Sequence, residues 1–164
     1  MLTIIHVNGP INSGKTSVGK ALADLLPNAA FIDGDDHDAP DDAPLAIRVE
    51  AALARIENEI AKAWGSFLVV AYPLEIQDYE RLRNKADKRG SRFFVLTLAP
   101  PLEVALMNRG ERTLAASERQ RILEMYREGY HTRPFSDASL DTTGLTPLES
   151  AARAVDLIRR APAS

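Results

Sequence analysis

The sequence predicts an α/β fold in which helices cover both faces of a parallel sheet. Along the 164 residues, short apolar segments rich in β-branched residues alternate with longer segments of helical periodicity. Strands that alternate with helices imply right-handed crossovers and therefore parallel strands. Residues 67–71 are apolar at every position, which is typical of a strand covered on both faces. We find no repeat, linker or low-complexity stretch, so we expect a single domain over residues 1–164.

Each expected strand is a short apolar segment bounded by turn-forming residues. Gly65 and Ser66 separate the third segment from the helix before it, and Pro100 and Pro101 stop the fourth. The expected strands are residues 2–7, 29–32, 67–71, 93–98 and 138–140.

Apolar residues spaced three and four positions apart predict the helices between these strands. A long helix follows Pro44, Gly90 closes the next one, and a further helix begins at Leu102 and ends near Arg109. The apolar stripes are Val18, Ala21, Leu22, Leu25 and Leu26; Val49, Leu53, Ile56 and Ile60; Ile76, Tyr79, Leu82 and Ala86; Leu102, Ala105 and Leu106; and Leu148, Ala151, Val155 and Ile158.

Capping patterns predict where the last two helices begin. Ser117 with Gln120 three residues later is a capping-box pattern for a helix that carries Tyr126 and Tyr130. Residues 146–149 read Thr-Pro-Leu-Glu, which supplies a cap, a proline at the first helical position and a glutamate at the third.

Residues 9–16 match the pattern G-x-x-x-x-G-K-[ST] between a predicted strand and a predicted helix. The backbone N–H groups of such a turn and of the helix N-terminus form a concave anion site. Lys15 adds a positive charge for the β- and γ-phosphates of ATP, and the Thr16 hydroxyl can ligate Mg²⁺. We therefore predict a phosphate loop with Lys15 as a catalytic residue. The predicted nucleotide-binding residues of the loop are Gly9, Pro10, Ile11, Asn12, Ser13, Gly14, Lys15, Thr16 and Ser17.

The carboxyl ends of the strands are where we expect the chemistry, since open parallel sheets bind ligands in the crevice beyond those ends. Four segments follow directly after predicted strands and should line one crevice. They are residues 9–16, 33–36, 71–74 and 99–101.

Asp33 and Asp35 leave the second strand directly into this crevice. Phosphoryl transfer to a hydroxyl needs Mg²⁺ on the phosphates and a group that accepts the acceptor's proton or orients its hydroxyl. Residues two apart at a strand end can share one side of the turn, so we assign Asp33 to the magnesium site and Asp35 to the acceptor hydroxyl, as a catalytic residue. A solvated acidic loop is the alternative interpretation, because Asp38, Asp41 and Asp42 continue the acidic run.

The phosphate loop, the Phe-Ile-Asp-Gly-Asp-Asp segment at 31–36 and a short arginine-bearing segment after it in the chain resemble the small P-loop metabolite kinases. Gluconate kinases and shikimate kinases are closest in pattern, with chloramphenicol-phosphotransferase-like proteins as relatives. The resemblance covers nearly the whole chain in element order. It implies the P-loop NTPase fold, a five-stranded parallel sheet in the order 2-3-1-4-5, and ATP-to-hydroxyl transfer. It places Asp33 on the family's magnesium-associated aspartate and Asp35 on its substrate aspartate.

The resemblance does not single out one acceptor. Residues 71–73 are Ala-Tyr-Pro where shikimate kinases carry a glycine triplet, and the lid histidine of gluconate kinases is absent from 109–117. No acidic residue closes the third strand, so a Walker-B aspartate is missing and Thr16 with Asp33 must hold the metal. The small-molecule acceptor stays open among sugar acids, cyclitols and antibiotics.

Arg109 and Arg112 lie between two predicted helices, where a lid around 109–117 would close over the triphosphate and exclude water. We expect both arginines to bind the nucleotide and Arg109 to be catalytic. A solvated helix–helix turn is the alternative. The expected substrate contacts are Asp35, Arg48 and Tyr72, with Arg127 and Arg133 as further candidates.

Composition excludes several function classes. The net charge of -3 argues against a nucleic-acid partner, and the absence of cysteine excludes disulfides, thiolate metal sites and cysteine nucleophiles. No apolar run is long enough for a membrane span and no signal peptide is evident, so we expect a cytoplasmic monomer or homodimer.

Two other functions fit a phosphate loop. A nucleotide-binding module or slow NTPase would have no small-molecule acceptor, and the position of Asp35 argues against it. A nucleoside-monophosphate kinase must bind a substrate phosphate, which the acidic stretch at 33–42 would repel.

Overall fold

The structure is a computed structural model that describes residues 1–107 and 113–162. Within these ranges the strands are β1 (Thr3–Asn8), β2 (Ala29–Asp33), β3 (Phe67–Ala71), β4 (Arg92–Leu98) and β5 (Ala138–Leu140). The helices are α1 (Lys15–Leu25), α2 (Leu45–Lys62), α3 (Ile76–Lys88), α4 (Leu102–Ala105), α5 (Ala116–Arg127) and α6 (Pro147–Arg160).

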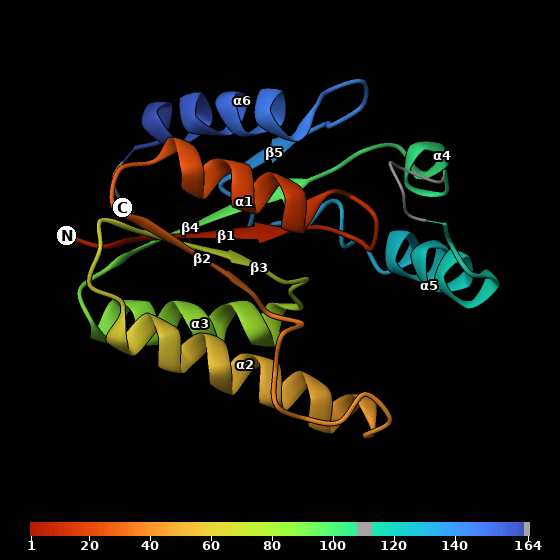
Figure 1. The fold of residues 1–164 in the computed structure, drawn as a ribbon, viewed down its shortest axis with the longest axis horizontal. Helices are drawn as coiled ribbons and strands as arrows, with labels where there is room; N and C mark the ends of the chain where they lie inside the picture. Colours follow the sequence, from red (N-terminus) through yellow and green to blue (C-terminus); the bar gives the residue numbers. More distant parts are fainter. Residues whose placement is uncertain (108–112, 163–164) are drawn as a thin grey trace.

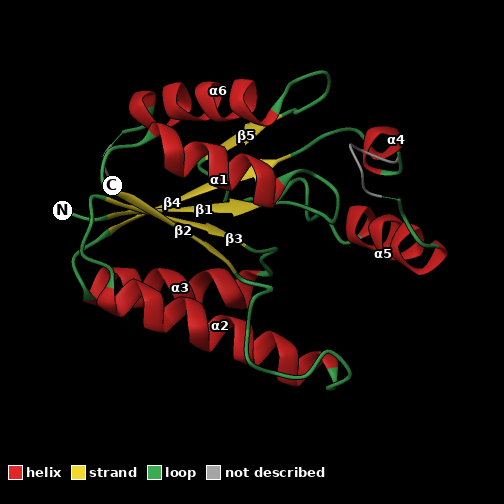
Figure 2. Ribbon diagram, viewed as in Figure 1, coloured by secondary structure: helices red, strands yellow, loops and turns green. Residues whose placement is uncertain are grey.

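All neighbouring strands pair in parallel, and their order across the sheet is β2-β3-β1-β4-β5. Helices α1 and α6 cover one face of the sheet, and α2 and α3 cover the other (Figure 1). The predicted α/β fold and strand order are therefore confirmed. Figure 2 shows that the loops at the carboxyl ends of the strands meet at one edge, on the side where α4 and α5 lie.

Two apolar layers hold the sheet between its helices, because successive residues of a strand face opposite sides. In β1, Ile5 and Val7 belong to the layer under α1 and α6, whereas Ile4 belongs to the layer over α2 and α3. All three side chains are fully buried. The central strand is thus covered on both faces, as a parallel sheet requires.

The capping pattern of the last helix is confirmed. The Thr146 hydroxyl accepts from the Glu149 amide at 3.1 Å, and the Glu149 carboxylate accepts from the Thr146 amide at 3.2 Å. The pattern predicted for the preceding helix is wrong. There, Ala115 is the N-cap and its N–H donates to the Glu118 carboxylate at 3.3 Å, so Ser117 lies inside the helix. Glu118 satisfies an end-of-helix amide that the sequence pattern assigns to Gln120.

Some expected helix positions also differ from the structure. Helix α5 ends at Arg127, so Tyr130 lies outside it. Leu25 and Leu148 are 45% and 59% exposed, although both were expected in buried stripes. Each lies in a terminal turn of its helix, since Leu25 ends α1 and Leu148 is the second residue of α6.

Candidate active site

The phosphate loop connects β1 to α1 through a turn that has no space for a side chain at Gly9. A Cβ atom there would lie 2.6 Å from the Ser13 Oγ and 2.8 Å from the Leu98 carbonyl oxygen, and the φ angle is +152°. Gly14 is the N-cap of α1 and has a φ angle of +97°. Both glycines of the motif are therefore required by close approach or by backbone conformation.

A cavity of about 520 Å³ opens at the N-terminus of α1. Residues 11–18 line it together with Asp35, with Thr142 and Leu145 of the connection from β5 to α6, and with Pro147 at the start of α6. The first hydrogen bond within α1 runs from the Val18 amide to the Gly14 carbonyl, so the amides of the preceding turn point out of the helix. A cavity lined by such amides is suited to an anion such as a phosphate.

The Lys15 ammonium group folds back over the loop and donates to the Pro10 carbonyl oxygen at 2.8 Å. The side chain is half-buried. Its positive charge is therefore held against the backbone of the 9–16 loop.

Thr16 and Asp33 lie in direct contact. The Thr16 hydroxyl donates to the Asp33 Oδ2 at 3.0 Å, and the Asp35 backbone N–H donates to the Asp33 Oδ1 at 3.0 Å. Asp33 is the last residue of β2 and pairs with Ala71 of β3, which fixes its position at the carboxyl edge of the sheet. The structure thus brings Thr16, Asp33 and Asp35 together across 19 positions of sequence, counted from Thr16 to Asp35.

These two side chains fit a magnesium ion in their chemistry. A hydroxyl and a carboxylate provide the hard oxygen ligands that Mg²⁺ prefers, and Mg²⁺ in phosphotransferases uses few protein ligands because water and substrate phosphates supply the others. In the part of the chain that the structure describes, no three His, Asp or Glu side chains gather as a metal cluster.

Arg55 is a residue that the sequence analysis did not assign to the site. Its guanidinium donates to the Asp33 carbonyl oxygen at 2.6 Å and lies 3.9 Å from the Asp36 carboxylate, which is largely exposed. Arg55 therefore fixes the turn after β2 from the side of α2. Its spacing of seven from Arg48, on the same face of a helix, was the available signal.

Tyr72 directly follows β3 and is only 8% exposed. A Cβ atom on Gly34 would lie 2.5 Å from the Tyr72 ring, so the ring packs directly on the turn that carries Asp35. Burial raises the pKa of Tyr72 to about 12; the carboxylates of Asp35 and Asp78 add to this rise, and Arg48 opposes it. Of the predicted substrate residues, Asp35 and Arg48 thus lie near enough to Tyr72 for their charges to shift its pKa.

The arginines that the sequence offered as anion ligands differ in their surroundings. The Arg48 Nε donates to the Ala43 carbonyl oxygen at 3.0 Å. Arg133 donates to the carbonyl oxygens of Leu74 and Glu128, each at 2.9 Å, and its guanidinium lies 4.0 Å from the centre of the Tyr130 ring. Arg133 is therefore a structural contact of the turn after β3.

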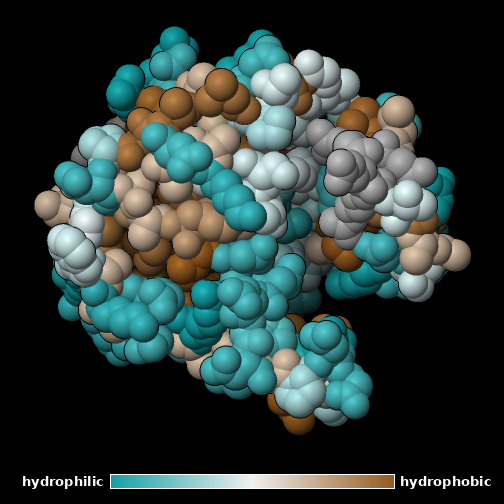
Figure 3. Space-filling view, viewed as in Figure 1, coloured by the Kyte–Doolittle hydropathy of each residue, from teal (hydrophilic) through white to brown (hydrophobic). Residues whose placement is uncertain are grey.

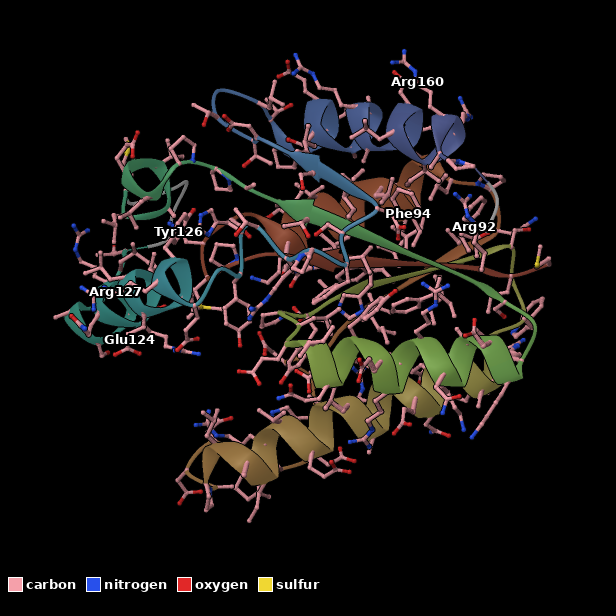
Figure 4. The ribbon with its side chains drawn as sticks, turned by 180° about the vertical axis from the view of Figure 1, so that it is seen from behind. Arg92, Phe94, Glu124, Tyr126, Arg127 and Arg160 are labelled. Carbon is pink, nitrogen blue, oxygen red and sulfur yellow. The ribbon has the colours of Figure 1, made fainter. Side chains whose placement is uncertain are left out.

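Arg127 is exposed and lies on α5 on the side away from the sheet, whereas Tyr126 lies between α4 and α5 (Figure 4). The Tyr126 hydroxyl donates to the Pro100 carbonyl oxygen at 2.5 Å. The predicted lid residues Arg109 and Arg112 lie outside the described residues.

The tip of the phosphate loop contacts the C-terminal end of α4 and the residues just after it. The Asn12 Nδ2 donates to the carbonyl oxygens of Ala105 and Met107 at 2.8 and 2.9 Å, and the Ile11 amide donates to the Met125 Sδ. Ile11 also packs against the small apolar cluster that α4 and α5 share. Figure 3 shows the surface hollowed between this region and the N-terminal part of α2.

No known family model matches the sequence, and no curated protein matches it. Solved structures do match. A gluconokinase from Sinorhizobium meliloti aligns with a TM-score of 0.75 at 23% identity over 97% of this chain and 93% of that one. A sugar kinase from Janibacter aligns with a TM-score of 0.69 at 21% identity over 99% and 97%.

The APS kinase of Mycobacterium tuberculosis, solved with AMPPNP and APS, aligns with a TM-score of 0.65 at 20% identity over 96% of this chain and 98% of that chain. The chain therefore has the fold of the P-loop small-molecule kinases. These kinases are named for different acceptors, so the fold does not choose among acceptors. Within the described ranges, none of the helices combines the length and apolar character needed to cross a membrane.

Proposed function

We propose that this protein transfers the γ-phosphoryl group of ATP, with Mg²⁺, to a hydroxyl of a small molecule of the sugar-acid, cyclitol or antibiotic type. The observation that supports this best is the position of Asp35. It lines the same cavity as the phosphate loop, and its backbone is bound by the carboxylate that also accepts from Thr16. A protein that only senses a nucleotide has no need of a second carboxylate there.

Each residue of the proposed site has one task. The loop amides and Lys15 bind the phosphates and stabilise the charge on the transferring group. The Asp35 carboxylate orients the acceptor hydroxyl and accepts its proton as the new P–O bond forms and the bond to ADP breaks. Thr16 and Asp33 would hold the magnesium ion, which would neutralise negative charge on the phosphates when bound.

The acceptor itself would lie against the turn at residues 72–75, which we call the acceptor wall. Tyr72 is buried on the turn that carries Asp35, and Arg48 is close enough to influence its hydroxyl. Thr142, Leu145 and Pro147 line the cavity together with the phosphate loop and would face the nucleotide. Arg109 and Arg112 stay part of the proposal as lid residues that exclude water from the transfer.

The test is a panel of sugars, sugar acids, cyclitols and antibiotics, assayed for acceptor-dependent ADP release and for phosphomonoester product by ³¹P NMR. We expect one acceptor class to raise ADP release well above the acceptor-free rate. Tight binding of Mg²⁺-ATP with the same slow ADP release for every compound would instead identify a nucleotide-binding module or slow NTPase.

A further inference from the structure

Asn8 is a polar residue in the central strand of the sheet. It is the last residue of β1 and is 0% exposed. Its side chain points to the same face as Ile4 and His6, because side chains alternate along a strand. A buried amide is destabilising unless its polar atoms are hydrogen-bonded, so the partners of Asn8 define its role.

Three segments distant in sequence supply these partners. The Asn8 Oδ1 accepts from the Leu74 amide at 2.8 Å, and the Nδ2 donates to the Thr97 hydroxyl at 3.1 Å and to the Tyr130 carbonyl oxygen at 3.3 Å. A backbone N–H must donate and a backbone carbonyl must accept, so these partners fix which end of the amide is which.

Two of the three partners belong to the acceptor side of the site. The acceptor wall contains Leu74, whose carbonyl oxygen accepts from Arg133. The Tyr130 hydroxyl donates to the Glu75 carboxylate at 3.2 Å, so the segment after α5 is bound to the wall as well. His6 supports the same wall from below, since its Nε2 bonds to the Tyr72 carbonyl oxygen at 2.8 Å.

Asn8 also directly precedes Gly9, the first residue of the phosphate loop. That glycine is closely surrounded by Ser13 and the Leu98 carbonyl, so the start of the phosphate loop cannot shift freely. The Asn8 amide is therefore the junction between the fixed phosphate loop and two segments that reach it from elsewhere in the chain.

We propose that Asn8 is a positioning residue whose side-chain amide holds the acceptor wall and the segment after α5 in fixed places relative to the phosphate loop. This rests on the proposed function. Loss of the amide displaces the acceptor from the transferring phosphoryl group while the loop amides still bind the nucleotide. A displacement of about 1 Å in a reacting group lowers turnover by as much as about 10²-fold.

The experiment compares Asn8→Ala, Asn8→Asp and the matched control Thr97→Val, each verified as folded by circular dichroism. Hydrogen exchange of the Leu74 amide, calorimetric Mg²⁺-ATP affinity, and kcat and KM for the acceptor are measured. Thr97→Val perturbs the same buried network but leaves the bonds of Asn8 to Leu74 and Tyr130 in place. Asn8→Asp keeps an oxygen that can accept from the Leu74 amide, but it places a second oxygen where the N–H donor to the Tyr130 carbonyl was.

In Asn8→Ala we expect Leu74 exchange to accelerate at least about tenfold and transfer to fall about 10- to 100-fold, with Mg²⁺-ATP affinity changed less than about threefold. In Asn8→Asp, Leu74 stays protected while transfer falls. Should Asn8→Ala not fold, Asn8→Ser takes its place with the same expected results. Any one of three results overturns the proposal. The Leu74 exchange rate is the same in Asn8→Ala as in the wild type, Thr97→Val loses as much transfer activity as Asn8→Ala, or Asn8→Ala loses Mg²⁺-ATP affinity as strongly as it loses transfer activity. If the wild type phosphorylates no acceptor, the proposed function fails, and Leu74 exchange with nucleotide affinity still decides the role of Asn8.

Discussion

The two halves of the site are built in opposite ways. The phosphate loop is one contiguous segment, residues 9–16, whose ligands are mainly backbone amides at the end of a helix. The proposed acceptor side is assembled from the turn after β2, the N-terminal part of α2, the turn after β3 and the segment after α5. Its shape depends on side chains that hold these segments together. A local motif therefore identifies the first half, whereas only the folded chain defines the second.

The largest expected effect is that of Asp35→Asn, which should lower phosphoryl transfer without lowering nucleotide affinity. Asp35→Asn keeps the shape of the side chain but removes the base, so transfer should fall about 10²- to 10⁴-fold. Mg²⁺-ATP affinity should stay close to that of the wild type, because Thr16, Lys15 and Asp33 are unchanged. Acceptor-dependent ADP release and calorimetry measure the two quantities. Asp38→Asn, an exposed residue of the same acidic run, is the control. Equal transfer by Asp35→Asn and wild type would contradict the mechanism.

Lys15→Ala tests the phosphate loop, because it removes the positive charge of that loop. Removal of one charge that stabilises the transferring group costs roughly 10²- to 10³-fold in kcat. We expect unchanged circular dichroism, since the Lys15 ammonium donates to a loop carbonyl oxygen, that of Pro10. Lys20→Ala, which removes an exposed lysine from the same helix, should turn over normally. Turnover at the wild-type rate by Lys15→Ala would refute the phosphate-loop assignment.

A matched pair of glycine substitutions tests whether the two halves respond separately to overpacking. Gly34→Ala places a Cβ 2.5 Å from the Tyr72 ring, and Gly19→Ala places one 2.6 Å from the Phe31 ring. Each should lower the free energy of unfolding by about 1–3 kcal/mol. Gly34→Ala alone should raise the acceptor KM, because the Tyr72 ring moves with the acceptor wall. Urea unfolding and steady-state kinetics measure both effects. The same KM in both variants would remove Tyr72 from the acceptor site.

The last prediction concerns the pH dependence of stability at His6, which bonds to the backbone of the proposed acceptor wall. Burial lowers the pKa of His6 from 6.5 to about 4, and the nearby Lys15 charge adds to the decrease. Between pH 6.5 and about 4, His6 is therefore mostly protonated in the unfolded chain and mostly neutral in the folded chain. Stability is full above pH 6.5 and falls as the pH drops through this window. From pH 7 to pH 4.5 the loss attributable to His6 should be roughly 2–3 kcal/mol.

Urea unfolding at the two pH values measures this loss, and His6→Gln, which keeps an amide donor for the Tyr72 carbonyl, is the comparison. The variant should lose less stability than the wild type over the same interval. The same pH dependence in both proteins would show that His6 is not buried in its neutral form.

The parts of the structure that the sequence predicts are mostly local in sequence, and most of the parts that it misses join distant segments. Strand and helix order, the phosphate loop and the contact of Thr16 with Asp33 follow from periodicity and from one motif, since each depends on neighbours in sequence or on strand ends that must meet. Asn8 and Arg55 could not be assigned in this way. Asn8 is 122 positions from its partner Tyr130. Arg55 shares a helix face with Arg48, but its partner is the backbone carbonyl of Asp33, and the identity of a residue does not show what its carbonyl binds. The position of the α5 cap was missed because Glu118 and Gln120 are both acceptable capping partners.

The backbone of Leu74 has one further consequence. Its amide is bound by Asn8 and its carbonyl by Arg133, both of which lie outside the acceptor wall. The course of the main chain through residues 72–75 is therefore encoded elsewhere in the gene. Pro73 and Glu75 are the two residues of this stretch that are not buried. Substitutions there leave the bonds of Leu74 to Asn8 and Arg133 in place. Under the proposed function, natural selection or a protein engineer could therefore change acceptor recognition at these two positions while the anchors of the main chain are kept.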